Sequence, residues 1–379
     1  MIASPLSLYL HFPWCVKKCP YCDFNSHPLG ANLDQQQYID ALIADLDYEL
    51  GLSSVNQPLH TIFMGGGTPS LFKPDAINRL LCAISNRLTF SKDIEITMEA
   101  NPGTTEHHDF NQYIQAGINR LSLGVQSFDS KQLHTLGRIH TSDDAFRAFD
   151  KARLAGFDNI NLDMMFGLPD QSTEAALADL SLALSMAPEH ISLYQLTLEP
   201  NTVFYRYPPA LPEHDHIAEM QHLLQRSLAN AGYEQYEVSA YARHGRKCSH
   251  NLNYWQFGDY LGVGAGAHGK LTNAGQITRR ARKKHPATYI KDAGTSEAIT
   301  ESRQIEAKDR LFEFLMNALR LRKGFQIDMA IQRTGLTEAQ IFDPLQAFFD
   351  NGFLIRQKKH VYCSDRGYLF LDHILQSIV

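Results

Sequence analysis

Residues 6–22 read LSLYLHFPWCVKKCPYC and combine a short apolar run with a compact cysteine loop. The run Leu6–Phe12 predicts a buried strand, and Cys15, Cys19 and Cys22 follow it directly. Thiolates bind soft metals, chiefly zinc and iron-sulfur clusters. A structural zinc site usually takes four ligands in two separated pairs, whereas here no fourth cysteine is near and position 24 is Phe24. The loop therefore favours a cluster with one iron open to an exogenous ligand. A zinc loop completed by a distant residue is the alternative.

Strand-like and helix-like runs alternate through the first half of the chain. Short apolar runs predict strands at residues 6–12, 59–64, 94–99, 120–125, 159–164 and 190–195. Helical spacing of apolar residues predicts helices at residues 37–50, 73–88, 106–115, 143–155, 173–185 and 213–231. Such repeated units indicate a parallel sheet with helical crossovers, and a complete barrel would need eight of them. We therefore predict an α/β fold, a partial (β/α)6 TIM-like barrel.

Three consecutive glycines follow the second predicted strand, in the stretch Met64–Pro69 with the sequence MGGGTP. Glycines allow the backbone to approach a ligand closely and to present amide groups. The stretch lacks the lysine of a P-loop and the spacing of a dinucleotide fingerprint, so alone it is equally typical of a tight turn. In a parallel sheet, however, this loop and the cysteine loop share the carboxyl edge, where ligands bind. We expect both loops to face one site.

Polar side chains end three further predicted strands. Glu99 lies in ITMEANPG, Gln126 in LSLGVQSF and Asp163 in NINLDMMFG, and Arg138 follows in LGRIH. Each of them alone is more typical of a structural polar residue than of a ligand contact. Their shared position at the ends of successive strands reverses that estimate and adds them to the candidate site.

The chain changes character twice after residue 232. Residues 233–270 are rich in Tyr, Gly and His and are expected to form irregular loops with a strand or two. The run Arg279–His285 is strongly basic and is either a solvated loop or a patch that holds anionic groups. A helix that carries Leu311, Leu315 and Leu319, helices near 327–333 and 337–351, and strands at 353–357 and 360–364 predict a winged-helix-like unit. The helix near 337–351 is expected to kink or restart at Asp343-Pro344. We divide the chain into residues 1–232 (partial barrel), 233–300 (irregular extension) and 301–379 (winged-helix-like domain).

The winged-helix-like unit is a poor candidate for a DNA reader. The segment in the position of a recognition helix, TEAQIFDPLQAFFDN, has three acidic residues and no Lys or Arg. Phosphate contacts need cations. A structural or partner-binding role is therefore favoured.

Composition supports a globular protein rather than a nucleic-acid binder. Of 379 residues, 35 are Lys or Arg and 41 are Asp or Glu, which gives a net charge of −6. The hydrophobic share of 44% excludes disordered and collagen-like chains. No stretch approaches the ~18 apolar residues of a membrane span. Lys17 and Lys18 follow the first apolar run instead of preceding it, so we expect no secretory signal and a cytoplasmic location.

At this point the chain resembles a radical S-adenosylmethionine (SAM) protein. The CxxxCxxC loop after the first strand and the GGGTP loop after the second carry the resemblance together. It implies a 4Fe-4S cluster on Cys15, Cys19 and Cys22 whose open iron is chelated by SAM. Reduction would then cleave SAM to methionine and a 5′-deoxyadenosyl radical, with the protein positioning the cofactor and shielding the radical.

Within that superfamily the chain resembles the oxygen-independent coproporphyrinogen oxidase-like group over essentially its whole length. The stretches that carry this resemblance are YLHFPWCVKKCPYCDFNS, FMGGGTPS, ITMEANPG, RLSLGVQSF, LGRIH, NLDMMFGLPDQ and HNLNYW. The resemblance implies contacts to SAM from Tyr9, Gly66, Gly67, Thr68, Glu99, Gln126, Arg138 and Asp163. Tyr9 would lie beside the cluster.

Several features bear on the choice between the heme chaperones and the oxidases of this group. The oxidases have a further cysteine where this chain has Phe24, and they carry a long N-terminal extension. The hexapeptide HNLNYW resembles the heme-binding motif of the chaperones, which implies His250 as a heme ligand and Tyr254 and Trp255 along the porphyrin face. Its asparagines suit a turn-prone segment, so we expect a surface pocket here rather than a packed helix. The basic run Arg279–Lys284 would pair with the heme propionates.

The resemblance thus implies a protein that binds heme, a 4Fe-4S cluster and SAM and delivers heme to client hemoproteins such as respiratory enzymes. It also implies an electron donor for the cluster, and it leaves peripheral membrane contact and a homodimer open. The charge balance and the acidic helix of the winged-helix-like unit predict no nucleic-acid partner. Three rivals remain: oxygen-independent decarboxylation of coproporphyrinogen III, another radical SAM reaction such as methyl transfer, and an interaction module dominated by the winged helix. Whether the chain is an enzyme stays open.

The remaining candidates for ligands are less specific. Cys82, Cys248 and Cys363 are expected to be dispensable for the cluster, with Cys82 packed in the core. If His250 does not bind heme, the next candidates are His214, His216 and His222 on the helix predicted at 213–231.

Overall fold

A twelve-stranded sheet organises the computed structural model, which describes residues 5–30, 33–53, 55–104 and 109–378. Six strands lie side by side in chain order in its middle: β1 (Leu6–Phe12), β4 (Leu59–Gly66), β5 (Phe90–Ala100), β6 (Arg120–Gln126), β7 (Ile160–Phe166) and β8 (His190–Gln195). Every neighbouring pair among them is parallel. The predicted α/β fold with a partial barrel is therefore confirmed.

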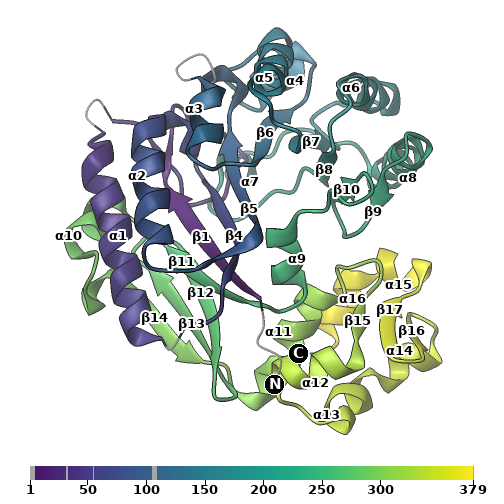
Figure 1. The fold of residues 1–379 in the computed structure, drawn as a ribbon. Coiled ribbons are helices and arrows are strands. Elements are labelled where there is room, and N and C mark those ends of the chain that lie inside the picture. Colours follow the sequence, from purple (N-terminus) through teal and green to yellow (C-terminus); the bar gives the residue numbers. More distant parts are fainter. Residues whose placement is uncertain (1–4, 31–32, 54, 105–108, 379) are drawn as a thin grey trace.

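Helices that connect these strands cover the outer face of the sheet (Figure 1). They are α1 (Gln35–Leu52), α2 (Pro74–Ser85), α3 (Phe110–Gln115), α5 (Ser142–Ala155), α6 (Thr173–Ser185) and α8 (His214–Asn230). Short helices α4 (Ser130–Thr135) and α7 (Val203–Arg206) lie in the loops. Local signals set the ends of the long helices: Asp34 caps α1, and Gly156 ends α5 in the left-handed conformation with φ 105°. Residues 106–108 of the helix predicted at 106–115 lie outside the described residues.

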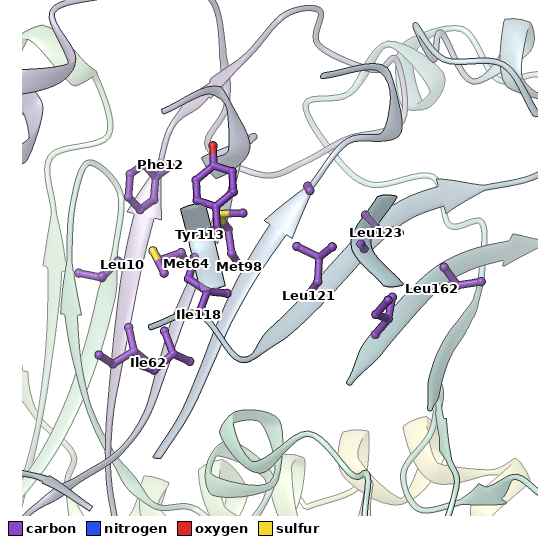
Figure 2. Packing of buried hydrophobic residues seen from close by; sticks show 14 of the residues in the cluster. Leu10, Phe12, Ile62, Met64, Met98, Tyr113, Ile118, Leu121, Leu123 and Leu162 are labelled. Atoms are coloured by element: carbon purple, nitrogen blue, oxygen red, sulfur yellow. The ribbon is translucent and has the colours of Figure 1, made fainter. Parts of the chain in front are cut away.

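The inner strands alternate between two kinds of side chain. Figure 2 shows Leu10 and Phe12 of β1 in the apolar core together with Met64 of β4 and Leu121 of β6. On β1, Leu6, Leu8, Leu10 and Phe12 are buried in this core. The side chains between them, such as Ser7 and His11, are polar and point to the other face, because successive strand residues face opposite ways. The barrel interior is therefore polar, and it leads to the carboxyl edge of the sheet.

The expectation that residues 233–300 are irregular is wrong. Strand β11 (Asp259–Val263) pairs in parallel with β1, and β12 (His268–Asn273), β13 (Gln276–Arg282) and β14 (Ile299–Gln304) extend the sheet in antiparallel order. At the other edge lie β9 (Glu234–Gln235) and β10 (Ala240–Ala242). The pairing of β11 with β12 requires glycine at position 262, because a Cβ there would lie 1.9 Å from the carbonyl oxygen of His268. The domain boundaries at 232 and 300 stay predictions.

The basic run is neither a solvated loop nor a free patch for anionic groups, because most of its charges are paired inside the protein. Arg282 is 1% exposed and binds the carboxylates of Asp45 and Glu49 on α1. The other pairs are Arg280 with Glu49, Arg279 with Glu313, and Lys283 with Asp292. Carboxylates from distant parts of the sequence thus neutralise the run.

The C-terminal part is built around a second hydrophobic core, to which Phe257 and Ile277 from the preceding segment also contribute. Its helices are α11 (Ala307–Ala318), α12 (Ile327–Thr334), α13 (Glu338–Phe342), α14 (Gln346–Asp350), α15 (Asp365–Leu369) and α16 (Leu371–Gln376). Strands β15 (Phe325–Gln326), β17 (His360–Cys363) and β16 (Leu354–Gln357) form a small antiparallel sheet. The helix predicted at 337–351 is interrupted by a 3-10 turn at Asp343–Leu345, where Pro344 breaks it. Within the part of the chain that the structure describes, no helix is long and apolar enough to cross a membrane.

Candidate functional site

One cavity of about 330 Å³ opens at the carboxyl ends of the parallel strands, and we call it the cofactor cavity. It brings together ten of the residues singled out in the sequence: Cys15, Cys19, Cys22, Gly66, Gly67, Thr68, Glu99, Gln126, Arg138 and Asp163. These residues come from five strands and the loops that follow them. Carboxyl edges of parallel strands are where ligands bind in such folds.

The three cysteines are free thiols, half-buried at the wall of this cavity. Burial raises the pKa of Cys15 and of Cys22. Among the described residues, no group of three His, Cys, Asp or Glu side chains is placed to hold a single metal ion. A cubane places each thiolate on a different iron, so three thiols of one loop at a cavity wall suit such a cluster.

Arg138 connects the cysteine loop to the sheet. One terminal nitrogen of its guanidinium lies 3.7 Å from the Sγ of Cys19, and the other donates a hydrogen bond of 2.5 Å to the carbonyl of Gly124. Its Nε is buried and has no hydrogen-bond partner among the described residues. A buried N–H without a partner is costly, so an acceptor on a bound ligand would satisfy it.

The glycine loop is shaped by its packing against β1. Gly66 has φ +103°, and a Cβ on it would lie 2.2 Å from the His11 ring. The N–H groups of Gly66, Gly67 and Thr68 donate to Glu99, Phe12 and Trp14 respectively. The expectation that this loop presents amides to a ligand is therefore wrong, because those donors already hold the loop in place. Backbone contacts to a ligand would come from carbonyl oxygens, which suit an ammonium group.

Two carboxyl groups face the cofactor cavity in a low-dielectric setting. Burial and the nearby charge of Asp163 raise the pKa of Glu99 to about 8. Burial also raises the pKa of Asp163, which accepts hydrogen bonds from Ser122 and Asn161. A cationic ligand would favour the charged form of both groups, so the pair suits an ammonium or sulfonium ligand.

Gln126 and Tyr194 in the cavity wall also indicate a binding site. Gln126 adopts φ +70°, which is unusual for a non-glycine residue, and its side chain accepts a hydrogen bond from Tyr194. Sequence reasoning missed Tyr194 and Ser122, which also line the cavity. The signal that could have found Tyr194 is its place near the end of the sixth parallel strand.

A second cavity of about 700 Å³ adjoins the first and shares Cys22, Gly66 and Glu99 with it. Tyr9 lines this second cavity and not the cofactor cavity, with its hydroxyl 2.9 Å from Nδ1 of His11. Tyr254 lies in the same wall. Tyr9 is thus placed next to the cluster loop, on the side away from Arg138.

The hexapeptide HNLNYW forms helix α9 (Ser249–Trp255) and is not the irregular surface segment that we expected. His250 is 1% exposed, and burial lowers its pKa to about 3. Thr61 donates to Ser7, so His250 Nδ1 must donate to Thr61 (2.8 Å), which leaves Nε2 to accept from the Tyr254 hydroxyl (2.9 Å). Both ring nitrogens are thus engaged, and heme ligation by His250 stays a prediction.

The other heme candidates lie apart from one another. Trp255 lines neither cavity; its ring lies under the guanidinium of Arg320 at 4.3 Å, against the C-terminal part. His214, His216 and His222 are exposed on α8 and also line neither cavity. Of the residues expected along the porphyrin face, Tyr254 alone reaches a cavity described above.

Comparison with known proteins identifies the family of this chain. The Radical SAM superfamily matches residues 9–183, and the HemN C-terminal domain matches residues 305–370. The chain is 45% identical over 376 residues to heme chaperone HemW of Haemophilus influenzae, covering 98% of this chain and 97% of that protein. It is 46% identical over 373 residues to heme chaperone HemW of Escherichia coli, with the same coverage, 98% and 97%.

A solved structure supports the fold. Coproporphyrinogen III oxidase (HemN) from Escherichia coli, described as a radical SAM enzyme, superposes with a TM-score of 0.81 and 21% identity. The match covers 99% of this chain and 90% of that one. Sequence likeness to the HemW proteins is much higher, and it extends over nearly the full length of each chain. This chain belongs to the HemW family of radical SAM proteins.

Proposed function

We propose that this chain is a heme chaperone, which carries a 4Fe-4S cluster and SAM and passes heme to client hemoproteins. One observation carries the proposal: in a chain of the HemW family, a cysteine-lined cofactor cavity adjoins a larger cavity with aromatic and cationic walls. Large mixed cavities of this kind are typical of small-molecule sites. The larger one offers room for cargo beside the cofactors.

Each group in the cofactor cavity has a role suited to its chemistry. Cys15, Cys19 and Cys22 would hold the cluster, which supplies one-electron chemistry when bound. Glu99 and Asp163 would accept hydrogen bonds from SAM and balance its positive charge. Arg138 would place its charge beside the Cys19 thiolate and offer a donor to the ligand.

Partners and location follow from the same proposal. Clients would be hemoproteins such as respiratory enzymes, and a reductant would supply the cluster with electrons. The six cysteines are free thiols, which supports a cytoplasmic location, since disulfides are rare there. Peripheral membrane contact and a homodimer stay predictions.

The rival function is oxygen-independent decarboxylation of coproporphyrinogen III. This chain shares its fold with the E. coli oxidase. At 21% identity, that likeness shows the fold alone and not the activity. The high identity to HemW proteins favours the chaperone.

The test is anaerobic reconstitution of the full chain, followed by hemin titration and transfer to an apo-peroxidase. We expect saturable heme binding and transfer that restores peroxidase activity. Product analysis with SAM, reductant and coproporphyrinogen III should find no protoporphyrinogen, and appreciable turnover there would establish the rival.

The same preparation tests the cluster ligands. We expect Cys22→Ala to lose the cluster, measured as iron and sulfide per chain, because it removes one of three thiolates. Cys82→Ala is the matched control and should keep the full iron and sulfide content, because Cys82 is exposed on α2. The expectation from the sequence that Cys82 packs in the core is wrong. Full iron and sulfide content in Cys22→Ala would contradict the assignment.

A further inference from the structure

We infer that the heme cargo lies in the second cavity, with the imidazole of His268 as its axial ligand and Lys18 and Lys284 beside its propionates. The inference rests on the proposed function and names the residues that would carry it. Heme in this cavity would displace neither the cluster nor SAM, because both belong to the neighbouring cofactor cavity.

The walls of the second cavity suit a flat aromatic macrocycle. Its volume of about 700 Å³ exceeds that of the cofactor cavity, about 330 Å³, and falls among cofactor sites of ~300–1,000 Å³. Tyr254 and Tyr260 form one side, with ring centroids 4.4 Å apart. Phe24 lies at the rim and is 60% exposed, so its ring is accessible to a ligand in the cavity. Aromatic faces stack well against a planar ring system.

Of the histidines at or behind this cavity, His268 is the one that is exposed and forms no hydrogen bond through its ring in the described structure. His11 is buried, and its two ring nitrogens contact the Tyr9 hydroxyl and the Asn25 carbonyl. The Nε2 of His27 has no hydrogen-bond partner among the described residues, but this atom is buried, and the ring lies against that of His285. Both nitrogens of His250 are engaged, as described above.

His268 differs from these because it is exposed at the start of β12 and lines the cavity. Its ring forms no hydrogen bond to any residue that the structure describes, so no internal bond must break for a nitrogen to bind iron. Neutral imidazole is the commonest protein ligand of this kind.

Two lysines give the cavity positive charge at its opening. Lys284 is exposed and, unlike the other cations of the basic run, has no carboxylate partner among the described residues. Lys18 donates to the carbonyls of Phe24 and Ser26, both at 3.2 Å, which leaves one of its three N–H donors for a ligand. Asp23 is the acidic residue at the same rim. A porphyrin with carboxylate side chains matches this pair of cations.

The experiment is titration of the full-length chain with three porphyrins, followed by absorbance and fluorescence. Hemin has iron and propionates, protoporphyrin IX lacks the iron, and the dimethyl ester of hemin lacks the propionate charges. Variants are His268→Ala, with exposed His216→Ala on α8 as control, and Lys18→Glu/Lys284→Glu, with Lys151→Glu on α5 as control. His250→Ala is compared in parallel.

We expect His268→Ala to shift the Soret band and to raise the Kd of hemin by about tenfold or more. The same variant should bind protoporphyrin IX as the parent does, because no metal bond is lost. The lysine variant should raise the Kd of hemin about two- to fivefold for each lysine. It should leave the Kd of the dimethyl ester unchanged. His250→Ala should keep the spectrum of the parent.

Two results would overturn the inference in different ways. If the parent binds hemin saturably and His268→Ala matches it in spectrum and affinity, or if His250→Ala alone loses the spectrum, the ligand is not His268 and the proposed function stands. If the parent takes up no hemin at all, the proposed function fails, and the inference fails with it.

Discussion

The guanidinium of Arg138 contacts both the Cys19 thiol and the backbone of β6, so a single side chain joins the cysteine loop to the sheet. Positive charge and N–H donors near a cysteine sulfur raise the reduction potential of an iron-sulfur cluster. We expect Arg138→Gln to keep its iron content and to lower that potential, measured by potentiometric titration with EPR detection. Arg138→Lys keeps the charge without the forked geometry of the guanidinium. Its reduction potential should therefore lie between those of the parent and Arg138→Gln. An unchanged potential in Arg138→Gln would refute this role.

Glu99 gives a second prediction for a single residue. Its pKa is raised from 4.5 to about 8, so the folded state holds the proton more firmly, and stability falls as pH rises from 4.5 toward 8. We expect Glu99→Gln to stabilise the ligand-free chain above about pH 8 by roughly 1–2 kcal/mol, a discounted figure because solvent reaches the cavity. The same variant should bind SAM more weakly, because it loses a charged acceptor.

Urea unfolding of the ligand-free protein at about pH 6 and about pH 9 measures this effect. Glu219→Gln, exposed on α8, is the matched control and should change neither stability nor SAM binding. Equal stability of Glu99→Gln and the parent at the higher pH would mean that Glu99 is not the titrating group.

At the scale of elements, helix α9 places a neutral histidine in the barrel interior. Burial lowers the pKa of His250 from 6.5 to about 3, so the unfolded chain takes up a proton that the folded chain does not. Stability is therefore lost as pH falls below 6.5 toward about 3. We expect His250→Gln to reduce this loss, measured as the change in urea midpoint between about pH 7 and about pH 5. His216→Gln is the control, and an identical pH dependence in His250→Gln would contradict the prediction.

Elements with local signals were predictable from the sequence. Strands β1 and β8 and helix α6 have the predicted bounds. The residues of the site were also predictable, because residues at the carboxyl ends of parallel strands lie at the same edge of the sheet. Ten predicted residues therefore line one cavity.

Elements that depend on distant partners were not predictable. The N-terminus of α9 is held by the Glu95 carboxylate, which accepts from the N–H groups of Ser249 and His250. Strand β11 is fixed by pairing with β1, with Leu6 opposite Asp259. The hexapeptide has no cap or apolar period of its own, so its asparagines suggested a turn. Pairing across such separations leaves no mark in the local sequence.

At the scale of the whole molecule, a buried ion-pair group joins the late strands to the first helix. Arg282 on β13 binds Asp45 and Glu49 on α1, and the Tyr289 hydroxyl donates to Asp45 as well. Removing one partner leaves buried charges unpaired, which typically costs about 3–5 kcal/mol. We expect Arg282→Ala to lower the free energy of unfolding by about that amount, measured by urea unfolding. Arg303→Ala, at a more exposed pair, is the control and should cost under about 1 kcal/mol.

The parallel pairing of β11 with β1 also sets an order in time. A ribosome makes β1 and the cysteine loop first, but β11 ends at Val263, so β1 lacks its second neighbour until about two-thirds of the chain has been synthesised. Until then one edge of β1 is an open row of backbone donors and acceptors, which is a template for wrong pairing. The strand that positions the thiols is thus among the first to be made and among the last to be enclosed. Stable enclosure of a metal cluster in the nascent protein must wait for the far half of its own polypeptide.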